Sequence, residues 1–304
     1  MSEALEKGEH LAASGAWVSS SAASQETPVI PFQIHHRIPL LRRPFYQRDQ
    51  ALAERNRAIA ERDRAIAESC TARQVGPFRP SWAEPALNDE ERRVVDRFHD
   101  IYYSKLDEGR GLHTIVLSWM GHEMLKCPLD LWVYQELIVA SRPDVILETG
   151  TYRGGSALFL ADICDLVGHG DVVTIDVDAS HEAGRPRHPR ITYLIGSSTA
   201  PDILARTERI LGGRTNVMVV LDSDHRRDHV LEELRSYCRF VPVGGYLIVE
   251  DTNVNGHPTY PDFGPGPWEA VDAFLAENDR FTADRTRERF ILTMNPRGFL
   301  RRVG

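Results

Sequence analysis

Two acidic clusters carry the residues that could do chemistry, and each follows a run of apolar, β-forming residues. The first cluster is Asp222–His225, and the second is Glu250 with Asp251. In an open parallel sheet, residues just beyond the carboxyl ends of neighbouring strands meet at one crevice, where ligands bind. Carboxylates gathered there would repel one another unless a cation lay among them, and hard oxygen ligands suit Mg²⁺, Ca²⁺ or Mn²⁺. The pattern therefore predicts a divalent cation site with a titratable histidine, His225, beside it.

A glycine-bearing turn lies upstream, between a predicted strand at 145–147 and a predicted helix at 155–167. Gly150 would let a ligand approach the backbone closely, and Gly154 with Gly155 would allow a tight turn and close helix packing. The spacing is GxxxGG, which is neither the GxGxxG of dinucleotide-binding proteins nor the GK[ST] of a P-loop. The turn alone is a weak signal for a ligand, and close packing without a ligand stays an alternative.

Polar residues at the next strand ends sharpen this prediction. Asp176 follows a strand at 172–175, where a carboxylate can accept hydrogen bonds from both hydroxyls of a ribose. Glu148, at the end of the first strand, could contact the charged end of the same ligand. Ser197, after the third strand, could line an adenine pocket. Together these strand ends predict a ligand that contains a nucleoside.

Several strings of residues, in this order, resemble class I S-adenosylmethionine-dependent methyltransferases. The chain most resembles the group named after cephalosporin hydroxylase, which includes rhamnosyl and other sugar O-methyltransferases. The resemblance covers residues 115–304. It rests on KCPLDLW at 126–132, YQE at 134–136, ETGTYRGGSA at 148–157, LDSDH at 221–225, EDTNVNGHP at 250–258 and GPGP at 264–267.

The resemblance implies a Rossmann-like, doubly wound, mostly parallel α/β fold. It also implies methyl transfer from S-adenosylmethionine to a hydroxyl of a sugar, a glycosylated natural product or a glycolipid. Mg²⁺ or another divalent cation would be bound by Asp222, Glu250 and Asp251, and it would lower the pKa of the acceptor hydroxyl. His225 would then be the general base that takes the proton. The expected contacts of the cofactor are Glu148, Gly150, Thr151, Tyr152, Gly154, Ser156, Asp176, Val177, Ser197 and Asp222.

The roles of several neighbouring residues stay open at the level of sequence. Asp224 could orient His225, bind the cation or cap a helix predicted at 226–238. His257 lies in a Gly/Pro-rich loop and could touch substrate or solvent, and Arg153 could face the cofactor or water. Core packing is favoured over a lid role for three residues that precede the first core strand, Trp119, His122 and Tyr134.

The order of segments along the chain predicts how these residues are positioned. We expect a flexible leader at 1–48, a heptad-like helix at 49–75, a helical lid or substrate segment at 76–128 and the methyltransferase core at 129–304. In the heptad-like segment one large apolar residue recurs per heptad, which favours a solvated helix with a docking stripe over an oligomerising coiled coil. Asn88 with Glu91 resembles a capping box that opens a further helix.

From residue 129 onward, helices and strands alternate, as in a doubly wound sheet. The predicted strands are 145–147, 172–175, 191–194, 216–221, 246–249 and 289–294. The predicted helices in this region are 129–140, 155–167, 201–211, 226–238 and 267–276.

Composition argues against several classes of protein. The net charge of −8 disfavours a nucleic-acid partner. No apolar run is long enough for a transmembrane segment, and the acidic N-terminus does not resemble a secretory signal. Four scattered cysteines without a CxxC pair indicate reduced thiols and a cytoplasmic protein. We expect a homo-oligomer that acts on a small-molecule or glycolipid acceptor.

Three alternative functions have weaker support. A glycosyltransferase could use the DxD triplet at 222–224 to hold a metal and a sugar nucleotide, but it would not need Glu250 and Asp251. An iron oxygenase requires two histidines and a carboxylate, usually with HxD spacing, which the strand-end motifs lack. A non-enzymatic scaffold that carries the heptad-like helix would not need a complete acidic set or His225.

Overall fold

The protein is described by a computed structural model that covers residues 86–106 and 117–304. The predicted leader at 1–48 and the heptad-like helix at 49–75 lie outside the described residues. The described part of 76–128 contains the helix α2 (Asp89–Leu106), but also two short antiparallel strands, β1 (Leu117–Trp119) and β2 (His122–Met124). The sequence did not predict these two strands.

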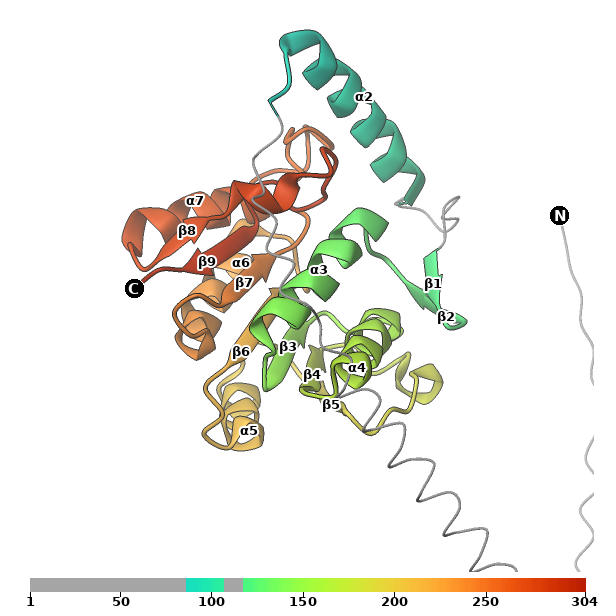
Figure 1. Ribbon diagram of the computed structural model, residues 1–304, viewed down its shortest axis with the longest axis vertical. Helices are drawn as coiled ribbons and strands as arrows, with labels where there is room; N and C mark the ends of the chain where they lie inside the picture. The colour runs from blue at the N-terminus through green and yellow to red at the C-terminus, as the bar shows by residue number, and fades with distance from the viewer. Residues whose placement is uncertain (1–85, 107–116) are drawn as a thin grey trace, which may run out of the picture. The chain divides into compact units, whose positions relative to one another are not determined.

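A mostly parallel sheet forms the centre of the described structure (Figure 1). Its strands lie in the order β5-β4-β3-β6-β7-β9-β8, and only the pairs that involve β9 are antiparallel. The chain moves outward from β3 in both directions, so the order reverses between β3 and β6, where open α/β sheets bind their ligands. The predicted doubly wound α/β fold is therefore confirmed. The bounds of the strands are β3 (Val145–Thr149), β4 (Asp171–Asp176), β5 (Ile191–Ile195), β6 (Val217–Leu221), β7 (Tyr246–Val249), β8 (Phe281–Ala283) and β9 (Phe299–Arg302).

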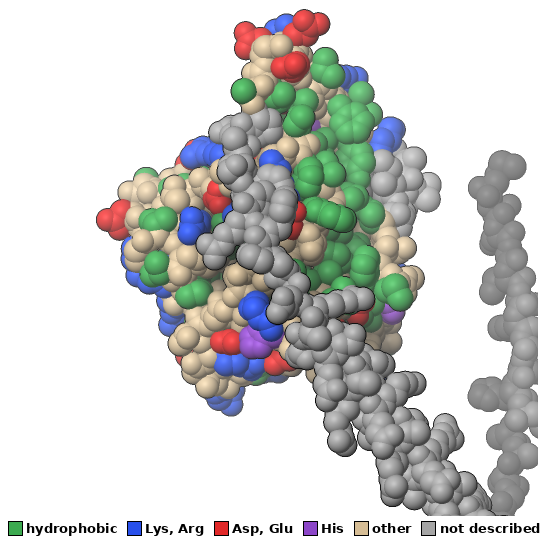
Figure 2. Space-filling view, viewed as in Figure 1, with side chains coloured by type: hydrophobic (Ala, Val, Ile, Leu, Met, Phe, Trp, Pro, Cys, Tyr) green, Lys and Arg blue, Asp and Glu red, His purple; other side chains and the backbone are tan. Residues whose placement is uncertain are grey.

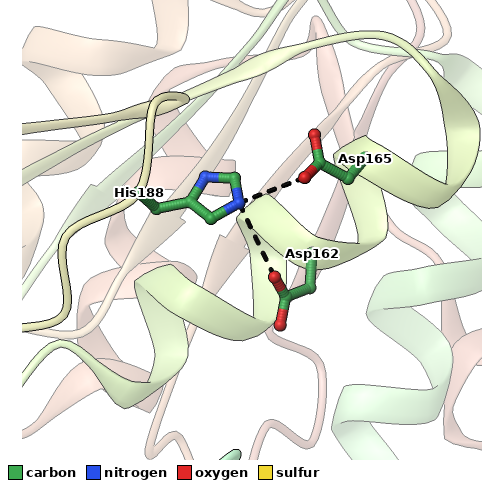
Figure 3. A group of neighbouring side chains, drawn as sticks. All are labelled: Asp162, Asp165 and His188. Carbon is green, nitrogen blue, oxygen red and sulfur yellow. Dashed lines mark hydrogen bonds and ion pairs between the residues drawn. The ribbon is translucent and has the colours of Figure 1, made fainter. Parts of the chain in front are cut away.

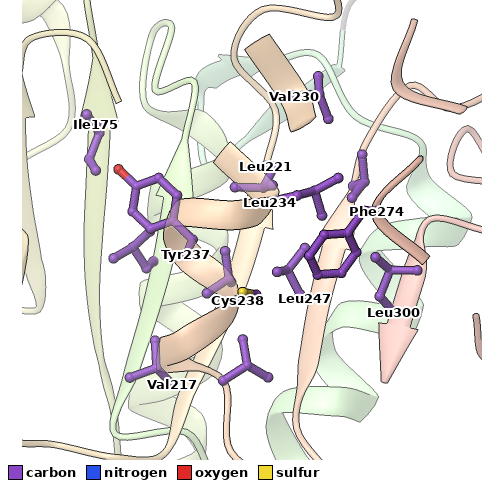
Figure 4. Packing of buried hydrophobic residues seen from close by; sticks show 14 of the residues in the cluster. Ile175, Val217, Leu221, Val230, Leu234, Tyr237, Cys238, Leu247, Phe274 and Leu300 are labelled. Atoms are coloured by element: carbon purple, nitrogen blue, oxygen red, sulfur yellow. The ribbon is translucent and has the colours of Figure 1, made fainter. Parts of the chain in front are cut away.

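Helices cover both faces of the sheet, because successive strand residues point to opposite faces and both sets are apolar. The helices are α3 (Pro128–Ser141), α4 (Gly155–Val167), α5 (Pro201–Leu211), α6 (Arg227–Tyr237) and α7 (Pro267–Glu277). Residues of α5, α6 and α7 pack in one buried cluster, and residues of α3 and α4 pack in a second. Figure 4 shows Leu234 and Tyr237 of α6 and Phe274 of α7 packed near Leu221 and Leu247 of the strands.

Helix α2 begins at the predicted capping box. The backbone N–H of Glu91 donates to Asn88 Oδ1 at 3.0 Å, and the N–H of Asn88 donates to Glu91 Oε2 at 2.9 Å. The helix is joined to the core by a hydrogen bond of 2.9 Å between His99 and Asn253. The hydroxyl of Tyr103 donates to Asp251 Oδ2 at 3.1 Å, so α2 reaches the second acidic cluster.

Apolar side chains gather on the surface over α2, α3 and the β1–β2 pair (Figure 2). The exposed residues there include Val94, Phe98 and Ile101 of α2, Met120 between β1 and β2, and Leu129 and Trp132 of α3. Leu125 belongs to this exposed set and also lines a cavity at the carboxyl ends of β3, β4, β5 and β6. The apolar surface therefore reaches the rim of that cavity.

The strand predicted at 289–294 is wrong. These residues follow a short 3₁₀ helix, η4 (Arg285–Glu288), and Ile291 has a φ of 74°, which a strand does not tolerate. The backbone N–H of Met294 donates to Asp130 Oδ2 at 2.9 Å instead of joining a strand ladder. The last strand of the sheet is β9, further along the chain.

Candidate active site

A cavity of about 560 Å³ lies at the carboxyl ends of β3, β4, β5 and β6. Strand ends meet there because the neighbouring strands are parallel and in register. Most of the predicted cofactor contacts line it: Gly150, Thr151, Tyr152, Ser156, Asp176, Val177, Ser197 and Asp222. The structure therefore gathers side chains from separate strand ends around one space.

Asp176 is fixed at the end of β4 by the glycine-bearing turn. Its Oδ2 accepts a hydrogen bond from the backbone N–H of Tyr152 at 2.7 Å, and its Oδ1 accepts one from Asp178 at 2.8 Å. The guanidinium of Arg185 lies 3.4 Å from Asp176 Oδ2 and also donates to the carbonyl of Tyr152. The sequence did not predict this buried arginine, which holds the carboxylate against the turn.

Gly150 brings the turn against the end of β6. Its φ is +87°, and a Cβ at this position would lie 1.7 Å from the carbonyl oxygen of Asp222. The N–H of Asp222 also donates to the carbonyl of Thr149 at 3.0 Å. A larger residue would push the turn after β3 away from the end of β6.

Replacing Gly150 with alanine is expected to lower the free energy of unfolding by about 3 kcal/mol, because backbone strain and overpacking add. Gly168→Ala is the matched control, since Gly168 also has positive φ but its Cβ would contact nothing within 4 Å. It should cost only about 1 kcal/mol. Urea denaturation of both variants measures the difference. Equal losses would contradict the close contact with Asp222.

Two predicted cofactor residues, Glu148 and Gly154, do not line the cavity. Glu148 is fully buried in β3, where its Oε2 accepts a hydrogen bond from Thr174 at 2.7 Å. Burial raises the pKa of this carboxyl above its ordinary value. Gly154 has a φ of +80° and faces Pro186 and Tyr193. The structure gives both residues contacts within the fold, and their roles toward a cofactor stay predictions.

Asp222, His225 and Asp251 converge at the cavity. One potential ligand atom from each lies within 4.8 Å of the others. His225 Nε2 is 3.3 Å from Asp251 Oδ2 and 3.9 Å from Asp222 Oδ1. Burial opposes the charged imidazole, but Asp251, Asp222 and Glu250 outweigh it and raise the pKa of His225. Two carboxylates and a histidine at these distances could hold a divalent cation or move a proton.

Glu250 has different partners from Asp251. Its Oε1 accepts hydrogen bonds from Lys126 Nζ at 2.5 Å and from the hydroxyl of Tyr134 at 2.8 Å. Lys126 Nζ also lies 2.5 Å from Asp222 Oδ2. Glu250 is therefore outside the converging group and does not line the cavity. Its predicted role as a metal ligand stays a prediction.

Lys126 was given no role from the sequence, although it begins the KCPLDLW string. It is only 4% exposed, and the carboxylates beside it raise the pKa of its ammonium group despite burial. The signal that could have found it is rarity, because the chain contains only three lysines, Lys7, Lys105 and Lys126. Tyr134 is buried as predicted, and in addition its hydroxyl reaches the acidic cluster.

Asp224 does not join the converging ligand atoms. Its Oδ1 accepts a hydrogen bond from the backbone N–H of Arg226 at 3.0 Å, and both oxygens contact the Arg226 guanidinium. These bonds lower the pKa of Asp224 to about 2. Arg226 itself precedes the first residue of α6. Of the three open roles for Asp224, the structure supports none directly, because the side chain is turned to Arg226.

The remaining residues discussed from the sequence have partners other than the converging group. The ring of His257 stacks on Trp268 with centroids 4.2 Å apart, and its Nε2 is 3.1 Å from Glu269 Oε1. Arg153 is half exposed and pairs with Glu123 at 3.3 Å. Trp119 packs against Phe159. His122 lines a separate pocket together with Arg153.

A second group, Asp162, Asp165 and His188, lies between α4 and the loop before β5 (Figure 3). His188 Nε2 is 3.2 Å from Asp165 Oδ2 and 3.7 Å from Asp162 Oδ1. Arg190 pairs with Asp165, and Trp119 Nε1 donates to Asp162 at 2.6 Å. Both carboxylates thus have protein partners, and we assign no catalytic role to this group.

Within the described ranges, no helix has the length and apolar character needed to cross a membrane.

Comparison with known proteins identifies the family. The family model described as rhamnosyl O-methyltransferase/CmcI matches residues 113–303. Rhamnosyl O-methyltransferase of Mycobacterium bovis is 38% identical over 214 residues, which cover 68% of this chain and 84% of that protein. The Mycobacterium leprae protein of the same name is 36% identical over 212 residues, covering 68% and 90%.

Solved structures show weaker likeness. The apo structure of CmcI is 24% identical, covers 62% of this chain and 76% of that one, and has a TM-score of 0.48. A CmcI structure described with Mg and SAM is 24% identical, covers 74% and 91%, and has a TM-score of 0.47. The assignment therefore rests on the sequence matches: the chain belongs to the rhamnosyl O-methyltransferase/CmcI family and is an S-adenosylmethionine-dependent O-methyltransferase.

Proposed function

We propose that this enzyme methylates a hydroxyl of a sugar or glycosylated small molecule and that the reaction needs Mg²⁺ or another divalent cation. The convergence of Asp222, His225 and Asp251 on the cavity that Asp176 also lines carries this proposal. The name of the mycobacterial relatives supports a sugar as the acceptor.

The cofactor end of the cavity is formed by the turn after β3 and by Asp176. The Asp176 carboxylate is held by the Tyr152 N–H and by Arg185, and it can accept hydrogen bonds from ribose hydroxyls. Gly150 keeps the turn close to Asp222, so the cofactor's methyl group would be positioned near the acidic cluster. S-adenosylmethionine supplies the reactive methyl, and the protein supplies binding and orientation.

The acidic end suits a hard cation, because Asp222 and Asp251 offer carboxylate oxygens beside each other. A divalent cation bound there would lower the pKa of a coordinated acceptor hydroxyl. His225 Nε2 would accept the proton of that hydroxyl, and Asp251 at 3.3 Å would stabilise the resulting imidazolium. Glu250 remains a predicted third carboxylate of the set.

The alternative, a DxD glycosyltransferase, is disfavoured by the position of Asp224. That carboxylate is bound by Arg226 and is therefore not paired with Asp222 around one cation. A homo-oligomeric state, a cytoplasmic location and a role in natural product or glycolipid synthesis remain predictions from the sequence.

Ligand-induced thermal shifts test the cofactor assignment. S-adenosylhomocysteine and Mg²⁺ are each expected to raise the Tm, since a ligand that binds only the folded state stabilises it. Asp176→Asn should weaken S-adenosylhomocysteine binding by about 10- to 100-fold, because hydrogen bonds to a charged group are lost. The Mg²⁺ shift should persist.

Asp228→Asn is the matched control, because Asp228 is 90% exposed on α6. It should leave both shifts unchanged. A thermal shift with a sugar nucleotide and none with S-adenosylhomocysteine would contradict the methyltransferase proposal in favour of glycosyl transfer.

A further inference from the structure

A buried lysine lies inside the acidic cluster. Lys126 Nζ is 2.5 Å from Asp222 Oδ2 and 2.5 Å from Glu250 Oε1, and its side chain is 4% exposed. It reaches them from the loop between β2 and α3, far away in sequence. The Glu250 carboxylate is buried and that of Asp222 is largely buried, at 17% exposure. Two such carboxylates so close together would repel strongly without a positive charge between them.

The contacts of Lys126 divide the oxygens of the acidic cluster into two sides. Asp222 uses Oδ2 for Lys126, which leaves Oδ1 on the side of His225 and Asp251. Glu250 uses Oε1 for both Lys126 and Tyr134. The ammonium group therefore fixes how Asp222 presents its second oxygen to the converging group.

The charge count agrees with this division. Asp222, Glu250 and Asp251 contribute −3 and Lys126 contributes +1, which leaves −2 (−3 + 1) for these four residues when all are ionised. One divalent cation would neutralise that remainder. Lys126 thus neutralises one of the three negative charges at all times, and a bound divalent cation would neutralise the other two.

We propose that Lys126 is a positioning residue: a built-in cation that holds Asp222 and Glu250 together and keeps the acidic cluster folded when no divalent cation is bound. This inference rests on the cation site of the proposed function. Lys126 contacts Glu250 through Oε1 and Asp222 through Oδ2, while Asp222 Oδ1 stays on the side of His225 and Asp251.

The test compares Tm values in EDTA and in Mg²⁺, without cofactor or acceptor. Lys126→Met keeps an unbranched side chain that ends where the lysine Cε does, but it leaves the Asp222 and Glu250 carboxylates without their counter-charge. Removal of one partner of a buried ion pair is strongly destabilising, so the Tm in EDTA should fall by about 10 °C. Because Mg²⁺ would then supply the missing compensation, it should raise the Tm of this variant more than that of the wild type.

The double variant Lys126→Met/Glu250→Gln removes the excess negative charge and should recover most of the lost Tm in EDTA. If Lys126→Met alone does not fold, a folded double variant still supports the proposal. The control is Lys105→Met, the same change at an exposed position on α2, which should leave the Tm and the Mg²⁺ shift as in the wild type.

Two results would overturn the proposal. One is a loss of Tm in Lys126→Met that is equal in EDTA and in Mg²⁺, which indicates a merely structural lysine. The other is a double variant no more stable than the single one. Failure of the wild type to transfer methyl groups would instead overturn the proposed function, and it would leave these Tm comparisons intact.

Discussion

Asp222→Asn is expected to lower methyl transfer by about a thousandfold. Asp222 contacts each part of the site. Its carbonyl oxygen lies 1.7 Å from where a Cβ on Gly150 would be, its Oδ2 lies 2.5 Å from Lys126 Nζ, and its Oδ1 lies 3.9 Å from His225 Nε2. Asparagine keeps the shape but removes the charge that attracts a cation. Loss of a metal that stabilises developing charge costs several kcal/mol, and loss of one positioned electrostatic group costs 10²- to 10³-fold.

Turnover and the Mg²⁺-induced thermal shift should both be measured for this variant, and both should be lost. Asp224→Asn provides a matched control two residues away, because that carboxylate also lines the cavity but is bound to Arg226. It is expected to change turnover by less than about threefold, the scale of a surface substitution. If the two variants lose activity equally, the DxD pair acts as a unit and our assignment of Asp222 alone is wrong.

His225→Ala is expected to lower turnover by about 10²- to 10⁴-fold, the usual contribution of a general base. Unlike Asp222→Asn, it should retain a Mg²⁺-induced thermal shift, because both carboxylates that face the cation remain. The base acts in its neutral form, and Asp251 and Asp222 raise the pKa of His225. Wild-type turnover should therefore fall as the pH drops through that pKa, and the residual activity of the variant should lack this dependence.

His229→Ala is the control for this prediction, because His229 also lines the cavity but contacts the hydroxyls of Ser223 at 3.1 Å and Ser198 at 3.3 Å and neither Asp222 nor Asp251. It should retain most of the turnover. Wild-type rates in His225→Ala across the pH range would show that another group takes the proton.

The core of the fold was predictable because its strands are short apolar runs whose two faces are both covered. The predicted bounds of α4, α5 and β7 agree with the structure. The strand predicted at 289–294 failed because a partner distant in sequence decides that segment: Asp130, on α3, binds both the Thr293 hydroxyl and the Met294 N–H. Local apolar patterning contains no information about such a contact.

The candidate site was predictable where chain order alone decides position. Residues at the ends of adjacent parallel strands must meet, which is why Asp176, Asp222 and Asp251 were found from spacing. Which partner each carboxylate binds was not predictable, because it depends on contacts that form only in the folded chain. Lys126 meets Asp222 and Glu250 across 96 and 124 residues.

The role of Asp224 stayed open in the sequence for a similar reason. Both follow the same strand, and only the turn before α6 decides that one carboxylate faces the cavity centre while the other binds Arg226. Tyr134 was expected to pack in the core, and it does, yet its hydroxyl also supports Glu250. Burial was thus predicted correctly while the polar contact of the same side chain was not.

Cation-dependent sugar O-methylation is tested most directly by a methyl-transfer assay with isotopically labelled S-adenosylmethionine and a rhamnosylated acceptor, with and without a chelator. Mass spectrometry of the product should show one labelled methyl group on a sugar hydroxyl. EDTA should abolish the transfer and excess Mg²⁺ should restore it. Transfer that persists at the full rate in EDTA, or the absence of labelled product from every sugar acceptor tried, would contradict cation-dependent sugar O-methylation.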